Sequence, residues 1–427
     1  MPSSQAEQEI LAALEQMDIV DCHEHIGSEA DRLAIPVDVF SLFSCYTHFD
    51  LLNAGMSESD YQRLFQRDLP LATRWNLFAP YWERIRWTSF SRPVHLALKR
   101  FYNADDLNEH NYAEISAQIR DANIPGVYQR VLGDACRIRT ILANRWPLAR
   151  QPYGLLLPVP PLLKEDMMTH WDDLAHPFFE PDACVATLDD YLEAVRRYVV
   201  AGKEAGAVAF KWVVRPDLPP DRRQAERTFA EIKQSGGTRM PKTPDMDLTP
   251  LTSFVADWGI RVATDQDMVI SVHTGYWQDF RKLDPSHLIP VLRRHPDTRF
   301  DIFHVGYPYV REALMLAKGF PNVWLNFCWT HIISQRFARE ALNEALDLLP
   351  FNKVLAFGGD YVTEALEKIY GHLVMARENV SAVLASRVDQ GQMTTDEALC
   401  IALRWFWDNP KELYRLNIKS SQVTDRK

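Results

Sequence analysis

Short, continuously apolar segments recur along the chain at intervals that leave room for helices between them. They predict strands at residues 18–23, 137–143, 153–159, 207–212, 268–273, 299–304, 322–327 and 353–358. Strands that are apolar throughout are typical of a parallel sheet covered on both faces. Apolar residues at helical spacing predict helices at residues 5–17, 188–202, 248–263, 285–295, 310–318 and 336–348.

The number and order of these segments predict an α/β fold, a (β/α)8 TIM barrel. Eight parallel strands are the number that closes such a barrel, and its active site lies at the carboxyl ends of the strands. We expect residues 1–27 and 137–418 to form the barrel. The 427 residues fit this prediction, because α/β barrels often exceed 200 residues as a single unit.

Residues 28–136 form a stretch between the first two predicted strands that is far longer than one barrel helix requires. Its aromatic residues recur at helical spacing, and Ser57-x-x-Asp60 is typical of a helix start. The stretch leaves the carboxyl end of the first strand, so we expect a helical cap that covers the barrel mouth and contacts the substrate. The alternative is a helical subdomain that only braces the barrel. A second polar stretch, residues 215–250, predicts a loop.

Composition narrows the class of protein. A hydrophobic content of 47% and a net charge of −10 describe a globular protein without the basic surface that nucleic-acid binding needs. No apolar run reaches the roughly 18 residues of a membrane span. The six cysteines show no CxxC spacing, and the first residues lack a signal-peptide core. We therefore expect a cytoplasmic homo-oligomer that acts on a small molecule and binds neither nucleic acid nor membrane.

Metal-ligand residue types occur at the ends of the predicted strands. His23 and His25 are two positions apart behind an apolar run, and such residues face the same way on a strand. Two imidazoles can then reach one metal, and imidazole suits zinc, copper, iron or nickel. His-x-His alone is a weak signal. Here, however, other chemically active residues also end short apolar runs: Lys211, His273, His304 and Asp360.

This ordered set resembles the amidohydrolase superfamily of metal-dependent barrel enzymes, over nearly all of the chain from His23 to Pro410. The details are similar to the amidohydrolase-related branch, which includes the uronate isomerases and the barrel domain fused to some glutamine synthetases. Residues 322–329 (NVWLNFCW) and 404–410 (RWFWDNP), together with the long insertion, are similar to uronate isomerase sequences.

The resemblance implies a divalent metal, Zn²⁺ above all, with one ion favoured. Its expected ligands are His23, His25, His273 and Asp360, and Asp360 is also the expected general base for a metal-activated water. His304 would bind a second metal or polarise the substrate carbonyl. Lys211 would bridge two metals if carboxylated, and otherwise bind a substrate carboxylate or carry protons. Asp360, His304 and Lys211 are the expected catalytic residues.

Other residues are candidates for substrate binding. Arginine can grip a carboxylate with two parallel hydrogen bonds, and aromatic residues after the strands can line a pocket. The candidates are Arg84, Arg86, Arg215, Tyr276, Trp277 and Trp329, with Tyr46 and His48 as weaker ones. For each of them the alternative is a structural or solvated side chain.

The sequence thus favours a metal-dependent hydrolase of a C–N, C–O or lactone bond in a small, carboxylate-bearing molecule. One alternative is an aldose–ketose isomerase similar to uronate isomerase, and another is a metal-dependent non-oxidative decarboxylase. A non-enzymatic scaffold is disfavoured, because all the expected ligand positions carry ligand residue types.

Overall fold

The computed structural model describes residues 4–145, 156–162, 185–216, 218–234, 247–276 and 279–420. In this part of the chain the backbone forms eight strands, all paired in parallel, in two sheets of order β1-β2-β3 and β4-β5-β6-β7-β8. The strands are β1 (Ile19–Glu24), β2 (Ile138–Ala143), β3 (Leu156–Pro158), β4 (Ala209–Val213), β5 (Val269–His273), β6 (Arg299–Phe303), β7 (Val323–Asn326) and β8 (Val354–Leu355). Each lies within or beside a segment predicted from the sequence.

Backbone hydrogen bonds join the two sheets at both seams. Beyond the end of β3, the Lys211 N–H of β4 donates to the Pro160 carbonyl at 2.8 Å. At the other seam, Cys22 of β1 donates to the Phe357 carbonyl at 3.1 Å, and His25 donates to that of Tyr361 at 2.9 Å. The strands therefore follow one another in a ring from β1 to β8 and back to β1. The predicted (β/α)8 fold is confirmed.

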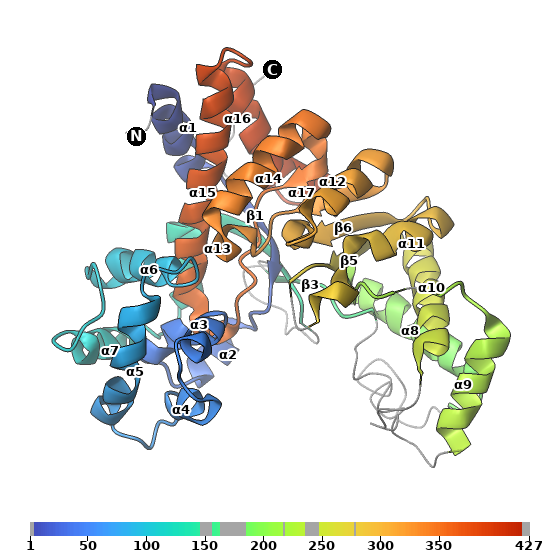
Figure 1. Ribbon diagram of the computed structural model, residues 1–427, viewed down its shortest axis with the longest axis horizontal. Helices are drawn as coiled ribbons and strands as arrows, with labels where there is room; N and C mark the ends of the chain where they lie inside the picture. Colours follow the sequence, from blue (N-terminus) through green and yellow to red (C-terminus); the bar gives the residue numbers. More distant parts are fainter. Residues whose placement is uncertain are drawn as a thin grey trace.

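Helices cover the outside of the ring (Figure 1). The barrel helices are α1 (Gln5–Gln16), α8 (Leu188–Glu204), α9 (Arg222–Gln234), α10 (Thr249–Asp265), α11 (Ile289–Arg294), α12 (Val310–Gly319), α13 (Thr330–Ile333), α14 (Gln335–Leu348), α15 (Leu366–Asp389), α16 (Thr395–Leu403) and α17 (Asn409–Leu413). Among the described residues, none of the helices combines the length and the apolar character needed to cross a membrane.

Two predictions of local structure, a loop and a helix, need correction. Residues 215–250 were expected to form a loop, yet α9 occupies part of them, because Ala225, Phe229 and Ile232 recur at helical spacing and are buried. The helix predicted at 285–295 is broken into a 3₁₀ turn at Pro285–Leu288 followed by α11. Pro290 lies in the first turn of α11, where its missing N–H costs no hydrogen bond.

The insertion after β1 is helical. It contains α2 (Glu29–Ala34), α3 (Thr47–Asn53), α4 (Glu58–Arg63), α5 (Leu71–Ile85), α6 (Arg92–Tyr102) and α7 (Tyr112–Asp121). Ser57 caps α4 as its sequence suggested, accepting from the Asp60 N–H at 3.1 Å. The insertion has its own apolar cluster, drawn from residues 37–119, and α6 packs against α15 of the barrel (Figure 1). Its assignment as a separate domain and cap stays a prediction.

A second apolar cluster joins the strands to the C-terminal residues and includes Val20, Leu142, Val269, Leu355 and Leu413. A polar network lies beside it. Asp301 of β6 is fully buried, and its Oδ2 accepts hydrogen bonds from the Tyr414 hydroxyl and from Asn326 Nδ2. Burial raises the pKa of the Asp301 carboxyl from 3.8 to about 7, so the fold holds a carboxyl group that it favours in the neutral form.

Candidate metal centre

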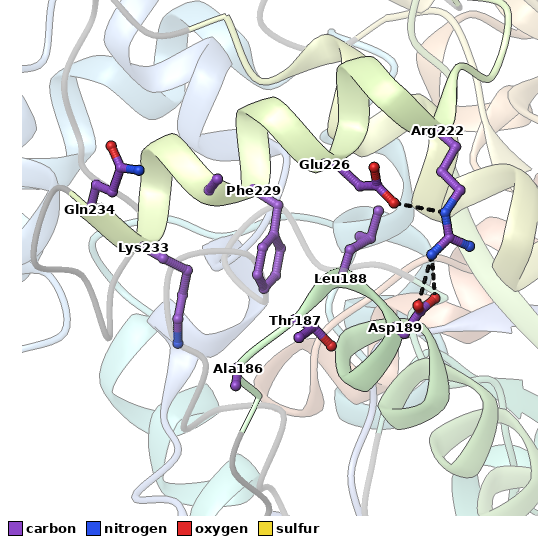
Figure 2. Close-up of a pocket in the computed structure, with 10 residues that line it drawn as sticks. Ala186, Thr187, Leu188, Asp189, Arg222, Glu226, Phe229, Lys233 and Gln234 are labelled. Carbon is purple, nitrogen blue, oxygen red and sulfur yellow. Dashed lines mark hydrogen bonds and ion pairs between the residues drawn. The ribbon is translucent and has the colours of Figure 1, made fainter.

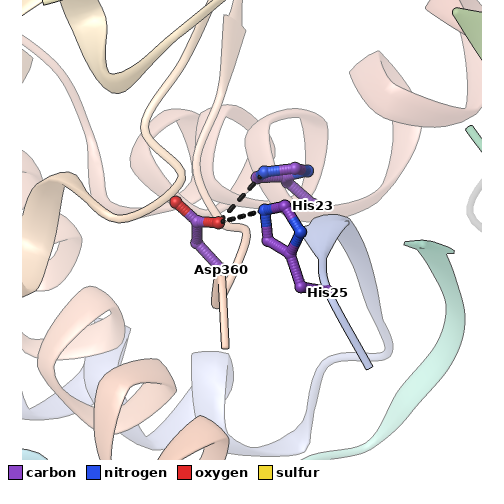
Figure 3. Close-up of side chains that lie close together, drawn as sticks. All are labelled: His23, His25 and Asp360. Carbon is purple, nitrogen blue, oxygen red and sulfur yellow. Dashed lines mark ion pairs between the residues drawn. The ribbon is translucent and has the colours of Figure 1, made fainter. Parts of the chain in front are cut away.

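Three side chains from the first and last strands of the ring converge on one point (Figure 3). His23 Nε2 lies 3.0 Å and His25 Nε2 3.1 Å from the same oxygen, Oδ1 of Asp360. One atom from each residue lies within 4.8 Å of the others. His23 and Asp360 are buried, whereas the His25 side chain is 40% exposed, so the centre opens to solvent on the His25 side.

Backbone geometry aims Asp360 at the histidines. Asp360 follows β8 in a turn and has a left-handed φ of 62°, which is uncommon for a residue other than glycine. Its N–H donates to the His23 carbonyl at 2.9 Å. Its own carbonyl accepts from the Tyr46 hydroxyl of the insertion at 2.5 Å. The turn is therefore tied both to β1 and to the insertion.

The electrostatics suit a neutral His23 beside an ionised Asp360 carboxylate. Burial, and then the nearby Lys211 ammonium, lower the pKa of His23 well below 6.5. For Asp360, burial acts to raise the pKa, but the charge and hydrogen bonds of His23 and His25 outweigh it and hold the pKa well below 3.8. Metal binding requires these protonation states, because imidazole binds through an unprotonated nitrogen.

His273 and His304 form a chain of hydrogen bonds next to this group. His304 Nδ1 lies 3.0 Å from the Cys328 carbonyl, which can only accept, so Nδ1 carries the proton. Burial lowers the pKa of His304 to about 4, which leaves its Nε2 unprotonated to accept from His273 Nδ1 at 3.1 Å. His273 Nε2 is then an unprotonated nitrogen, and it is buried without a hydrogen-bond partner.

This donor set fits a divalent metal. Two imidazole nitrogens and a carboxylate oxygen are a common set for Zn²⁺, and the lone pair of His273 Nε2 is a further candidate ligand. His304 uses its Nδ1–H on a backbone carbonyl, and its Nε2 lies 3.9 Å from Asp360 Oδ2. The roles of the individual residues stay predictions, but the structure brings His23, His25, Asp360 and His304 together.

Lys211 lies at the same centre. Its Nζ is 3.3 Å from His23 Nε2 and 3.7 Å from the centre of the Phe303 ring, and the side chain is buried. Burial lowers the pKa of its ammonium from 10.5 to about 8. Carboxylation, binding of a substrate carboxylate and proton transfer all stay open as its role.

Aromatic residues border the centre. Trp329 contacts His304 edge-on at 5.1 Å between ring centres and lies 5.7 Å from Tyr276. The insertion adds Tyr46 and Phe90, which stack on Trp329 at 4.8 and 6.3 Å. Two of the predicted pocket residues, Tyr276 and Trp329, are thus brought together with Tyr46. Trp277 lies outside the described residues.

The predicted arginines lie in different surroundings. Arg84 donates to the Ala54 carbonyl at 2.6 Å, and Arg86 pairs with Asp106, both within the insertion. Arg215 is half-buried and follows Val214, whose N–H donates to the His273 carbonyl at 3.1 Å. His48 pairs with Glu58. Substrate contact by any of these residues stays a prediction, but the backbone places Arg215 beside a candidate ligand.

Two acidic residues of the centre were not predicted. Asp21 and Glu24 flank His23 in the Asp-Cys-His-Glu-His motif, and both are fully buried. Two acids within a buried strand indicate a partner or a function, because aspartate and glutamate are almost never fully buried without one. The sequence showed the two acids, but it did not show that β1 is buried along its whole length.

A separate pocket of about 500 Å³ lies between the start of α8 and the helix α9 (Figure 2). Arg222 there pairs with Asp189 and Glu226, so its charge is neutralised. No predicted site residue lines this pocket.

Comparison with known proteins identifies relatives of the whole fold. A family model described as "Amidohydrolase" matches residues 158–416. Protein fluG of Emericella nidulans is 27% identical over 233 residues, which is 50% of this chain but only 26% of that protein. The chain thus matches about a quarter of the length of this curated relative.

Two solved structures share the architecture. Uronate isomerase from Thermotoga maritima superposes with a TM-score of 0.79 at 17% identity, covering 96% of this chain and 98% of that one. Glucuronate isomerase from Caulobacter crescentus gives 0.77 at 19% identity, covering 98% and 96%. At these identities the likeness concerns the fold.

Proposed function

Because the chain belongs to the amidohydrolase family, we propose that it is a metal-dependent hydrolase of a small, carboxylate-bearing molecule with a C–N, C–O or lactone bond. The observation that carries this proposal is that the two carboxylate oxygens of Asp360 face different partners. Its Oδ1 is shared by His23 and His25, while its Oδ2 lies near His304 at 3.9 Å. One oxygen can therefore hold a cation while the other accepts a proton.

His23, His25 and Asp360 would hold the metal, with His273 as a further ligand, and zinc suits this set best. When bound, a divalent metal polarises a carbonyl and lowers the pKa of a bound water toward neutrality. The chain's own residues supply the rest. Asp360 takes the proton from the attacking water and returns it to the leaving group. His304, held neutral by burial, keeps a fixed ring orientation through its bond to Cys328.

The reaction type is tested by isotope incorporation. The zinc-loaded protein is screened against N-acyl amino acids, lactones bearing a carboxylate, and uronates, in H₂¹⁸O and in D₂O. A hydrolase places one ¹⁸O in the product acid and no deuterium on carbon. Deuterium at a sugar carbon would instead establish an aldose–ketose isomerase, and loss of CO₂ would establish a decarboxylase; either result would overturn the proposal.

Recognition of the substrate carboxylate is assigned to Arg215. Replacing Arg215 with alanine should raise KM about 10- to 100-fold, because a hydrogen bond to a charged group contributes about 1.5–3 kcal/mol. We expect kcat and metal content to stay close to those of the unchanged protein. Arg84→Ala is the matched control, since Arg84 already bonds to the Ala54 carbonyl. A KM increase in Arg84→Ala or Arg86→Ala, with none in Arg215→Ala, would transfer this role to the insertion.

A further inference from the structure

In the turn that contains Asp360, the backbone groups next to the carboxylate all make hydrogen bonds. The Asp360 N–H and carbonyl bond to β1 and to the insertion, as described above. The two neighbouring N–H groups, of Gly359 and Tyr361, donate to side chains. Those side chains are two acids of β1, one on each side of Asp360.

Asp21 and Glu24 provide these acceptors. Asp21 Oδ1 accepts from the Gly359 N–H at 3.3 Å and from the His23 N–H at 3.2 Å. Glu24 Oε2 accepts from the Tyr361 N–H at 2.6 Å. Asp21 thus links the turn to the backbone of His23. Glu24 holds the N–H of the residue that follows Asp360, the residue with the left-handed φ. A left-handed φ in a non-glycine residue persists only when its surroundings impose it.

The space around the turn admits little movement. A side chain on Gly358 would overlap the backbone nitrogen of His23 at 2.9 Å and Cβ of Cys328 at 2.6 Å. A side chain on Gly359 would overlap Glu24 Oε1. Both glycines are therefore needed for the turn to approach β1 this closely, and Glu24 is the group that the second glycine leaves room for.

Asp21 Oδ2 and Glu24 Oε1 are buried, and neither has a hydrogen-bond partner among the described residues. Among the ion pairs of the described residues, neither acid has a basic partner. Burial raises the pKa of Asp21 to about 7 and that of Glu24 well above 4.5.

We propose that Asp21 and Glu24 are positioning residues, two buried acids whose bonds to the Gly359 and Tyr361 N–H groups hold the 358–361 turn in the conformation that places the Asp360 carboxylate between His23 and His25. The inference rests on the proposed role of Asp360 as a metal ligand. Neither acid belongs to the group of potential metal ligands formed by His23, His25 and Asp360. Each acts through the backbone N–H groups on either side of Asp360.

Zinc affinity of the full-length protein tests this pair, measured by competition with a chelating indicator. Glu24→Ala should weaken Zn²⁺ binding about 10- to 100-fold, the usual cost of losing a group that orients a ligand. Glu24→Gln should stay within about threefold of the unchanged protein, because its amide oxygen can accept from the Tyr361 N–H as the carboxylate does. Equal loss in both variants, or no loss in Glu24→Ala, would overturn the proposal.

A glycine pair supplies a second test that leaves both acids in place. Gly359→Ala should weaken Zn²⁺ binding by displacing Glu24, whereas Gly319→Ala is the matched control, because nothing lies within 4 Å of a Cβ added there. Adding Gly359→Ala to Glu24→Ala should cause little further loss, since the obstructing carboxylate is gone. Additive losses would contradict the proposal. If Glu24→Ala fails to fold, the single Gly359→Ala variant decides, and an unchanged zinc affinity in that variant would overturn the proposal.

Zinc binding and hydrolysis separate the role of the two acids from the proposed reaction. If the unchanged protein does not bind Zn²⁺, the metal role of Asp360 and this inference fall together. If zinc binds and the variants behave as stated but no hydrolysis is found, only the proposed reaction fails.

Discussion

Replacing Asp360 with alanine should abolish tight metal binding and lower the rate of hydrolysis by at least about 10³-fold. Removal of a general base alone costs about 10²–10⁴-fold in rate. Asp360 also supplies the oxygen on which His23 and His25 converge, at 3.0 and 3.1 Å. Both losses occur in the same variant, so neither metal content nor turnover should be retained. Metal analysis of the purified protein and single-turnover kinetics measure the two effects.

The control for this variant is Asp301→Asn, which changes another buried carboxyl of the barrel. It should keep its metal, because Asp301 bonds to Tyr414 and Asn326 rather than to the candidate ligands. An Asp360→Ala protein that keeps stoichiometric zinc would show that the histidines bind without the carboxylate, and the base role would have to be assigned elsewhere.

Asp301→Asn has a large expected effect of its own, on stability against pH. The unfolded chain ionises this carboxyl near its ordinary pKa of 3.8, but the folded chain keeps the proton until about pH 7. Between these values the native state binds more protons than the unfolded state, so the free energy of unfolding falls as pH rises. This difference between the two pKa values of Asp301 corresponds to a loss of at most about 4 kcal/mol in the free energy of unfolding.

In Asp301→Asn this loss of stability at high pH should disappear, because asparagine cannot ionise. Its amide oxygen can still accept from Tyr414 and Asn326. The variant and the unchanged protein should unfold at similar denaturant concentrations near pH 4. The variant should become more stable by a few kcal/mol at pH 8. Urea unfolding at both pH values measures the difference. A difference that does not change with pH would show that Asp301 is ionised in the fold throughout.

The strands could be predicted because a barrel strand carries its own signal. Most contain a run of apolar residues, as β5 (Val269–His273) does, because both faces of the strand are buried, although polar residues such as Asp21 and Asp301 also lie within strands. The candidate ligands followed from the same signal, since His23 lies next to the carboxyl end of β1 and His273 ends β5. Convergence of His23, His25 and Asp360 is then a property of the fold rather than of local sequence.

Other parts of the centre depend on tertiary contacts that no local pattern encodes. Tyr46 reaches the Asp360 carbonyl from a position 314 residues away, and this required the path of the insertion. Asp21 and Glu24 could be recognised as a pair only once the turn after β8 lay against β1. Helix α9 was missed because its apolar positions are few and charged residues surround them, so tertiary burial decided its conformation.

The position of the centre at the seam between the first and last strands has a consequence for how the chain matures. His23 emerges early in synthesis, but the carboxylate that completes its group is 337 residues further on and is held by the bond from the Asp360 N–H to the His23 carbonyl. Contacts of such long range form late, because the entropy of closing the loop must be overcome first. An incomplete chain therefore lacks the full ligand set. If the proposed centre binds its metal, metal uptake would show that folding is complete, and a bound ion would link the last strand to the first.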